Sequence, residues 1–351
     1  MGGQDSISRR RFLGYAGALG VGLSANSLLA ACGTSSGPAA PLTPVTFLLD
    51  VAPYGKHALF YVPLQNGYWK EQGLDVSIHS AQGSLDCVNK VAAQAADFGF
   101  ADTGSAIIGR GQGALVKEVA MVHYRNLMAI IGLDKKPIRQ PSDIEGKTLG
   151  ATAADAPRAV LPIFAKINNI DINKVKLLTM DQLVKPAALT QGRCDGTMDF
   201  FTAYPAYQAA AQQQNLTLTH FLYADNGLDI YNNGIIARDE TIASKPDLVR
   251  KFVLGLIKGI VWTIENPDKA TQILIEQQPG LSASVARAQL QIAIDFLMVD
   301  EVKKHGIGPM DPARMAKTLD VISQAYTLKN PVKLEDIYTN SFVPKNMLPK
   351  K

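Results

Sequence analysis

Short apolar runs alternate with amphipathic stretches along the chain from residue 45 onward. The run VTFLL at 45–49 predicts a buried strand, which passes through a turn containing Pro53 and Gly55 into a helix-like segment. Further strands are expected at 73–79, 97–101, 116–124, 128–133 and 146–150, with a return strand at 235–238. This alternation predicts an α/β fold with mostly parallel sheets covered by helices.

Helix boundaries are expected where small polar residues precede an apolar periodicity. Ser84 is expected to cap a helix over 85–95, and the stretch from Asp102 to Ala106 is expected to open the next helix. Three long amphipathic helices are expected near the C-terminus, at 246–265, 282–298 and 311–328. A proline at position 63 is expected to disturb the helix that follows the first turn.

Two extended runs around Arg125 and Asn126 predict a first crossing between two lobes. One lobe is expected to comprise 45–126 and 238–344, and the other 127–237. Two lobes joined by two crossover strands form a hinged clamp. Ligands in such folds bind between the lobes, which close by hinge motion.

The first 31 residues have the pattern of an export signal. Three arginines at 9–11 precede Phe12, Leu13 and a glycine-rich apolar run to residue 31, a pattern typical of twin-arginine export. The sequence LAAC at 29–32 resembles a lipobox, so Cys32 is expected to carry a lipid anchor, with a flexible tether at 32–44. A membrane-spanning helix is the alternative interpretation, but the run is short and rich in glycine for one.

Composition excludes several classes of protein. The net charge of +4 over 351 residues is too small to indicate nucleic-acid binding. After Cys32 only Cys87 and Cys194 remain, in segments expected to lie in different lobes, so no disulfide framework is expected. The histidines are scattered without metal-ligand spacing, and neither a nucleophile elbow nor a phosphate-binding glycine loop occurs. We therefore expect neither an enzyme nor a metal or cofactor site.

Several motifs, in order, resemble one family of proteins. They are LD at 49–50, HALFYV at 57–62, GYW at 67–69, GLDV at 73–76, ADFGF at 96–100, PSDIEGKTLG at 141–150, GRCD at 192–195 and GLDIYNN at 227–233. This order is similar to that of periplasmic solute-binding proteins that deliver thiamine pyrimidine precursors to ATP-binding-cassette (ABC) importers, relatives of sulfonate, nitrate and taurine binders. The resemblance implies the two-lobed architecture of a type II periplasmic binding protein. The family usually has tryptophan where Val51 stands and asparagine where Tyr54 stands, so the resemblance does not identify the ligand.

Candidate ligand-binding residues follow the expected strand ends. In the first lobe a carboxylate, an aromatic hydroxyl and an imidazole follow the first strand, and a carboxylate with two hydroxyls opens a later helix. These residues are Asp50, Tyr54, His57, Asp102, Thr103 and Ser105. Helix capping is the alternative role for Asp50 and for the trio at 102–105.

The other candidates lie in the second lobe and near the second crossing. Carboxylates beside aromatic rings suit a flat, nitrogen-bearing ring. The residues are Asp199, Tyr204, Asp229, Tyr231 and Asn233. Thr152, Asp155 and Arg158 follow a glycine at a strand end, where Arg158 either pairs with an acidic ligand or is a solvated surface residue.

Together these patterns predict a monomeric, lipid-anchored receptor of the periplasm or cell envelope. It is expected to capture a small heteroaromatic solute and to present it to the permease and ATPase subunits of an ABC importer. A receptor for sulfonate, taurine or nitrate is the alternative with the same fold. An enzyme of the thiamine-pyrimidine-synthesising class is the alternative of another kind, although the chain lacks the cysteine-rich iron-binding stretch of those enzymes.

Overall fold

The computed structural model describes residues 41–326 and 328–350. The expected export signal, Cys32 and the tether up to residue 40 lie outside the described residues. The expected tether ends too late, because Thr43 and Pro44 already belong to the first strand and pair with Leu74 and Asp75 of the second.

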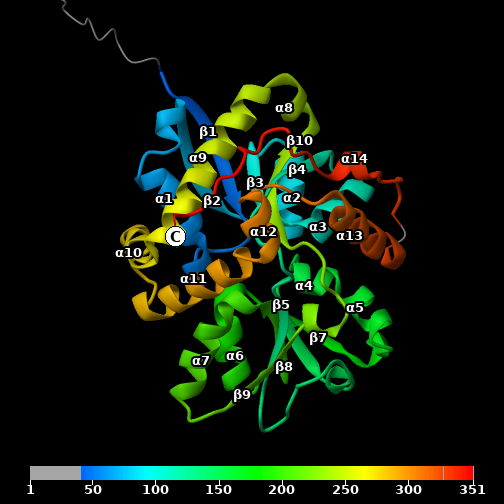
Figure 1. Cartoon of the computed structure of the whole chain (residues 1–351). Coiled ribbons are helices and arrows are strands. Elements are labelled where there is room, and N and C mark those ends of the chain that lie inside the picture. Colours follow the sequence, from blue (N-terminus) through cyan, green and yellow to red (C-terminus); the bar gives the residue numbers. More distant parts are fainter. Residues whose placement is uncertain (1–40, 327, 351) are drawn as a thin grey trace, which may run out of the picture. The chain divides into compact units, whose positions relative to one another are not determined.

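Two mixed sheets organise the chain into an upper and a lower lobe (Figure 1). The first sheet has the strand order β2-β1-β3-β10-β4 and the second the order β7-β6-β8-β5-β9. The strands of the first are β1 (Thr43–Leu49), β2 (Leu74–Ser80), β3 (Phe98–Asp102), β4 (Val116–Met121) and β10 (Asn233–Arg238). Those of the second are β5 (Met128–Leu133), β6 (Thr148–Ala151), β7 (Lys176–Thr179), β8 (Gly196–Phe200) and β9 (Leu218–Leu222).

Each sheet contains one strand that comes from a crossing and runs against its neighbours. β10 is antiparallel to β3 and β4, and β5 is antiparallel to β8 and β9, whereas β1 with β2 and β6 with β7 are parallel. The expected α/β two-lobed class is confirmed, but the expectation of mostly parallel sheets is too simple. The return strand also belongs to the first sheet, so the expected boundary at residue 237 lies inside β10, and the second crossing lies between β9 and β10.

Helices cover both sheets, and the helices that the sequence predicts are among them. The helices before β10 are α1 (Ala58–Gln65), α2 (Ser84–Ala92), α3 (Thr103–Gly111), α4 (Ala156–Ala159), α5 (Leu161–Ile167), α6 (Lys185–Thr190) and α7 (Tyr204–Gln212). Those after it are α8 (Asp239–Ser244), α9 (Pro246–Glu265), α10 (Pro267–Gln277), α11 (Ala283–Leu297), α12 (Asp300–His305), α13 (Pro312–Ala325) and α14 (Leu334–Ile337). None of the helices among the described residues combines the length and apolar character needed to cross a membrane.

The structure differs from the expected helix cap at Ser84 and places Pro63 inside a helix. Ser84 is the first residue of α2 rather than its cap, because Gly83 is the N-cap and the Ser84 hydroxyl makes no hydrogen bond within the described chain. Gly83 has a φ of 120°, and a Cβ there would lie 2.3 Å from the carbonyl oxygen of Ala154, so this close approach requires glycine. Pro63 does lie inside α1, where its ring packs against Gly259 of α9.

Aromatic packing joins α9 to the first sheet. Phe252 of α9 stacks on Phe98 of β3 at 4.0 Å between ring centroids and on Trp69 at 5.1 Å. The indole nitrogen of Trp69 also donates to the carbonyl oxygen of Phe252 at 2.9 Å. This packing fixes α9 on the first sheet through the first residue of β3, and the candidate residues lie at the opposite, carboxyl ends of β1 and β3.

Candidate functional site

A fully buried ion pair lies at the carboxyl end of β1. Asp50 accepts a hydrogen bond from Lys56 Nζ at 2.6 Å and lies 2.9 Å from His57 Nε2. Asn233, from the start of β10, donates its side-chain N–H to the same carboxylate at 3.1 Å. The sequence grouped Asp50 with Tyr54 and His57 and listed Asn233 separately, near the second crossing. The structure brings Asn233 to Asp50 and adds Lys56, which was not among the candidates. We call these four residues the Asp50 network.

Hydrogen bonding fixes the protonation of His57. Its Nδ1 accepts the backbone N–H of Tyr54 at 3.0 Å, so Nε2 carries the hydrogen that it donates to Asp50. Burial lowers the pKa of His57 to about 4, and the ring is neutral at neutral pH. Burial alone would raise the pKa of Asp50, but the Lys56 ammonium and His57 outweigh it and hold that pKa well below its usual value.

A second buried charge cluster lies in the other lobe. Lys185, at the start of α6, pairs with Asp155 and lies 3.9 Å from Asp199 of β8. Burial alone would lower the pKa of Lys185, but these two carboxylates outweigh it and raise the pKa. Asp199 is also bound by Gln182 Nε2 at 2.9 Å and by the Tyr207 hydroxyl at 2.8 Å. We call this group the Lys185 network.

The two networks meet where the lobes touch. The Tyr54 hydroxyl lies 2.9 Å from Thr202 Oγ1 of the second lobe, within hydrogen-bonding distance. The Lys56 ammonium lies 4.5 Å from the ring centroid of Phe200 at the end of β8, and 5.1 and 5.2 Å from those of Phe100 and Tyr54. Three aromatic rings from both lobes therefore surround one buried cation, a favourable arrangement when the cation is desolvated.

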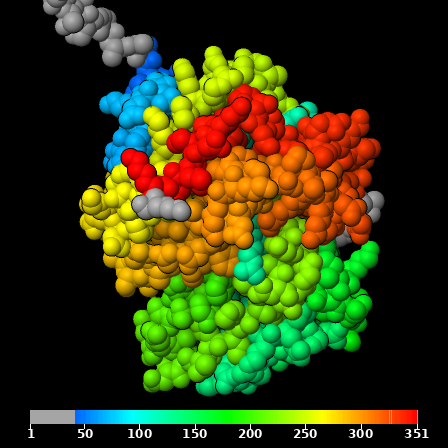
Figure 2. Space-filling model, in the orientation of Figure 1, coloured from blue at the N-terminus to red at the C-terminus, as the bar shows by residue number. Residues whose placement is uncertain are grey.

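Helix α11 forms part of the contact between the lobes. It packs on the 3-10 turn η1 (Gly55–His57) of the first lobe and on α7 of the second. The backbone N–H of Gly55 donates to Gln289 of α11 at 2.9 Å. On the face that Figure 2 shows, the orange segment that includes α11 lies directly against the green second lobe.

A pocket of about 370 Å³ opens between the lobes beside these contacts. The first lobe contributes Val51, Ala52 and residues 80–82, which follow β1 and β2. The second lobe contributes Thr152 and residues 181–184. Gln182 links this pocket to the Lys185 network, because its amide binds Asp199. Strand ends of open α/β sheets commonly place ligands in such a crevice.

The trio at the start of α3 satisfies much of its own hydrogen bonding. Asp102 is the N-cap, and its carboxylate accepts the backbone N–H of Ser105 at 2.8 Å and the hydroxyl of Ser105 at 3.2 Å. Thr103 Oγ1 lies 2.7 Å from the carbonyl oxygen of Asn232 and 2.6 Å from buried Glu118. Burial raises the pKa of Asp102 to about 7. Capping accounts for Asp102 and Ser105, and Thr103 binds the second crossing.

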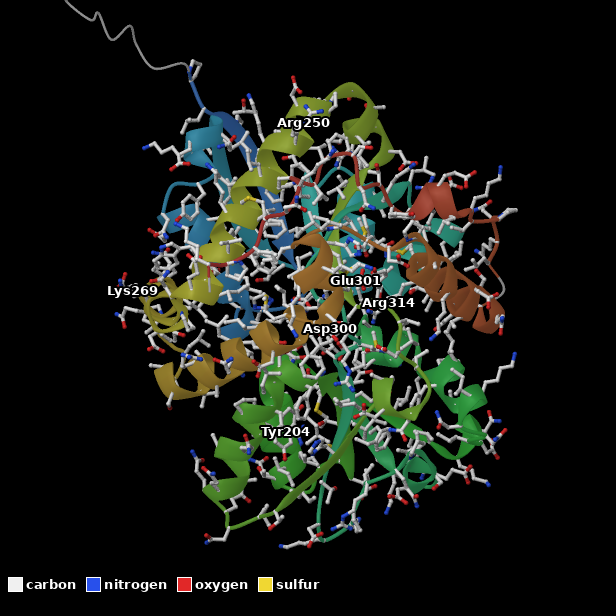
Figure 3. All side chains as sticks on the ribbon, in the orientation of Figure 1. Tyr204, Arg250, Lys269, Asp300, Glu301 and Arg314 are labelled. Atoms are coloured by element: carbon white, nitrogen blue, oxygen red, sulfur yellow. The ribbon has the colours of Figure 1, made fainter. Side chains whose placement is uncertain are left out.

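Two expected ligand residues face the C-terminal helices instead. The Tyr231 hydroxyl donates to Glu301 and accepts the backbone N–H of Asp311 at 2.7 Å. Asp229 is about half exposed and pairs with Arg314 at 3.2 Å. Figure 3 shows Glu301 and Arg314 side by side on these helices. The structure therefore does not bring Asp229 and Tyr231 to the contact between the networks; of the YNN stretch, the two asparagines lie there.

Tyr204 also lies apart from the Asp50 network. It is half buried at the start of α7, where its ring stacks on Phe201 at 4.8 Å. Tyr204 is labelled in the lower lobe in Figure 3. One helical turn later, Tyr207 takes the position next to Asp199 that the sequence assigned to Tyr204. Arg158 donates to the hydroxyl of Thr179 at 2.9 Å and makes no ion pair within the described chain.

Three buried polar residues were missed in the sequence, namely Lys56, Lys185 and His123. Lys56 stands beside His57 in a turn with an aspartate six residues earlier, a spacing that gives no sign of burial. Lys185 precedes a proline, and only the fold brings it to Asp155 and Asp199. His123 was noted only as one of several scattered histidines, although it lies two residues after the end of β4, on the first crossing.

Cys87 and Cys194 are free and buried, in different lobes. Within residues 41–326 and 328–350 no group of three or more histidine, cysteine or acidic side chains is arranged to hold a metal ion.

Two lobes, two crossings and polar groups that converge between them define the class of two-lobed binding proteins. A solved structure confirms this fold: the alkanesulfonate-binding protein SsuA from Xanthomonas axonopodis pv. citri, bound to MOPS, superposes with a TM-score of 0.67 at 13% identity. The match covers 86% of this chain and 99% of that one. The chain has the periplasmic-binding-protein fold.

The chain belongs to the NMT1/THI5-like family, whose model matches residues 55–270. It is 25% identical to the riboflavin-binding protein RibY of Chloroflexus aurantiacus over 86% of this chain and 87% of that protein. It is 23% identical to the formylaminopyrimidine-binding protein of Halalkalibacterium halodurans over 85% and 90%. A yeast relative, 4-amino-5-hydroxymethyl-2-methylpyrimidine phosphate synthase THI5 of Saccharomyces cerevisiae, is 23% identical over 70% of this chain and 75% of the enzyme. These matches confirm the family resemblance of the sequence motifs.

Proposed function

We propose that this chain is the solute-binding component of an ABC importer and that it captures a small heteroaromatic compound between its lobes. The observation that carries the proposal is the convergence of Tyr54 and Phe100 of one lobe with Phe200 and Thr202 of the other around buried polar groups. Aromatic faces with a few fixed polar atoms are typical of sites for flat heterocycles. Relatives named for riboflavin and formylaminopyrimidine binding support this class of solute.

The proposed binding residues follow from where the lobes meet. Asp50, Tyr54, His57 and Asn233 supply polar contacts from the first lobe and the hinge. Asp199 acts from the second lobe, through Gln182 at the edge of the pocket. Reversible capture would then favour the closed state only by the solute's extra affinity for it.

A sulfonate, taurine or nitrate receptor is the second candidate, favoured by the fold similarity to an alkanesulfonate-binding protein. An anion needs an uncommitted cation or several free N–H donors. The buried cations at the contact are Lys56 and Lys185, and each is already paired with carboxylates. This pairing favours a neutral or cationic ring over a small anion.

Delivery and location complete the proposal. We propose export by the twin-arginine route, lipidation at Cys32, residence in the periplasm or cell envelope as a monomer, and delivery of the solute to a permease. The sequence pattern at 9–32 supports the export and the anchor.

A thermal-shift screen of the purified full-length protein tests the binding function. The panel contains riboflavin, formylaminopyrimidine, 4-amino-5-hydroxymethyl-2-methylpyrimidine, taurine, methanesulfonate and nitrate. A compound present at 100 times its dissociation constant adds about 2.7 kcal/mol of stability, which raises the melting temperature measurably. A shift with a heterocycle supports the proposal, and a shift with sulfonates or nitrate alone replaces it by the second candidate. Mass spectrometry of the recovered compound separates a receptor, which returns it unchanged, from an enzyme.

A further inference from the structure

Three side chains at the hinge have buried polar atoms that no described residue satisfies. They are both ring nitrogens of His123, Oδ1 of Asn232 and Oδ1 of Asn233. All three residues are 0% exposed. A buried polar atom without a partner costs about 1–3 kcal/mol, so several at one place in a fold require an explanation.

These atoms belong to neighbouring positions on the two crossings. The backbone N–H of His123 donates to the carbonyl oxygen of Asn233 at 2.8 Å. The backbone N–H of Asn232 donates to the backbone carbonyl oxygen of His123 at 3.2 Å. The His123 ring lies edge-on to Phe100 at 5.4 Å between centroids. The Asn233 amide binds Asp50, so the group adjoins the Asp50 network and the aromatic rings around Lys56. We call His123, Asn232 and Asn233 the hinge floor.

Hydrogen bonds fix which atoms of the hinge floor are free. Asn126 Oδ1 accepts the backbone N–H of Met128 at 2.9 Å, so it is an oxygen, and the Asn232 nitrogen points to it at 3.3 Å. The Asn233 nitrogen donates to Asp50. The free atom of each asparagine is therefore its oxygen, which only accepts hydrogen bonds.

His123 adds one donor and one acceptor. Burial lowers its pKa well below the usual value, so the ring is neutral and carries a single N–H. The hinge floor thus presents three acceptors and one donor. A complementary solute edge must be rich in N–H donors.

We propose that the hinge floor is the specificity-determining part of the solute site and that it binds the N–H-bearing edge of an amino-substituted aromatic heterocycle. This inference rests on the proposed function. An amino group that enters the closed cleft supplies hydrogens to oxygens that are otherwise unpaired, so its affinity is concentrated in the closed state. A sulfonate offers only acceptor oxygens, which the hinge floor rejects because its acceptors would remain unpaired.

The test measures how tightly two small molecules of similar size bind to the wild-type protein, to a hinge-floor variant and to a control variant. The probes are 4-amino-2-methylpyrimidine and 2,4-dimethylpyrimidine, which differ by an amino group in place of a methyl group. The variant is His123→Phe, which keeps a flat ring against Phe100 and removes both unpaired nitrogens. His79→Phe at the exposed end of β2 is the matched control.

Isothermal titration calorimetry should show that the wild-type protein binds the amino probe at least tenfold more tightly than the dimethyl probe. His123→Phe should weaken the amino probe about tenfold and leave the dimethyl probe unchanged, and His79→Phe should change neither. His123→Gln, which keeps one donor and one acceptor, should restore part of the affinity. His123→Phe should melt no lower than wild type, because it removes polar atoms that the protein itself leaves unpaired.

Other outcomes overturn the inference in recognisable ways. If the wild-type protein does not prefer the amino probe, or if His123→Phe binds that probe as tightly as the wild type does, the hinge floor does not determine which solute binds. A lower melting temperature for His123→Phe together with unchanged affinity would assign His123 a purely structural role. If riboflavin binds in the thermal-shift screen, the proposed function stands whatever the calorimetry shows for the hinge floor. If no compound in the thermal-shift panel binds, both the proposed function and the hinge-floor inference are wrong.

Discussion

Lys56 Nζ lies 2.6 Å from Asp50 Oδ2, and both side chains are essentially excluded from solvent. Only six residues separate them, yet the pair sits at the contact between the lobes, with Phe200 of the second lobe over the ammonium. Breaking a buried ion pair by removing one partner leaves an uncompensated charge, which costs far more than the pair itself contributes.

Lys56→Met should therefore lower the free energy of unfolding by about 3–5 kcal/mol, measured by urea denaturation at pH 7. The matched control is Lys90→Met, because Lys90 forms a surface pair with Asp86 at the same 2.6 Å distance and should cost less than about 1 kcal/mol. Adding Asp50→Asn to Lys56→Met should recover part of the loss. Equal effects of the two single lysine changes would contradict the assignment of a buried pair.

The Tyr54 and Thr202 hydroxyls form a side-chain hydrogen bond between the two lobes. Tyr54→Phe removes it while keeping the ring, so the closed state should lose about 0.5–1.5 kcal/mol relative to the open state. Small-angle X-ray scattering should then show a larger radius of gyration without added solute. Tyr204→Phe, whose ring packs on Phe201 away from the Asp50 network, is the control and should leave the scattering unchanged. Identical curves for all three proteins would show that this bond does not hold the lobes.

Gly55 allows α11 to approach the turn that carries Lys56 and His57. A Cβ at this position would lie 2.1 Å from the backbone oxygen of Ala286 and 2.5 Å from Cβ of Gln289. Gly55→Ala should cost about 1–3 kcal/mol of stability and, by shifting the turn, weaken solute binding. Gly280→Ala has open space around it and should be neutral. Denaturant unfolding of both variants checks this, and a neutral Gly55→Ala would mean that α11 can move away at no cost.

The sequence was sufficient for the parts of the fold that repeat a local pattern. The helix over Pro246–Glu265 has its expected bounds because its apolar period is long and its first residue is a proline. The membership of β10 in the first sheet was not predictable in the same way. A buried strand has the same sequence pattern in either lobe, and only its pairing with strands distant in the sequence decides which sheet it joins.

The residues of the candidate site likewise divide into those with a local sequence signal and those that only the fold brings together. Asp50 and His57 follow directly from a strand end and a turn, so a local signal finds them. Lys185 of α6 and Tyr207 of α7 are brought to Asp199 only by the fold, and the sequence analysis chose Tyr204, one helical turn too early. His123 carries no motif at all, because its importance lies in what its ring nitrogens lack, and an unpaired atom is visible only in three dimensions.

Glu118 is expected to make the stability of the protein depend on pH. Its Oε1 lies 2.6 Å from Thr103 Oγ1, which also lies 2.7 Å from the carbonyl oxygen of Asn232. A hydroxyl has one hydrogen and cannot donate to both oxygens, so a protonated Glu118 supplies the second. Burial agrees with this, because it raises the pKa of Glu118 well above its usual value.

The sign of the pH dependence follows from linkage. Above the unfolded pKa near 4.5 the unfolded chain loses this proton while the native protein keeps it, so stability present at low pH is lost as pH rises toward the native pKa. The loss is about 1.4 kcal/mol per pH unit for one proton. Glu118→Gln imitates the protonated acid and lacks this loss, so its stability relative to wild type should increase steadily from pH 5 to pH 8 in urea unfolding. Glu71→Gln, at a surface pair with Lys258, should shift stability by less than about 1 kcal/mol. A constant difference between Glu118→Gln and wild type across this range would show that Glu118 is ionised in the native protein, and that Thr103 donates to it rather than to the second crossing.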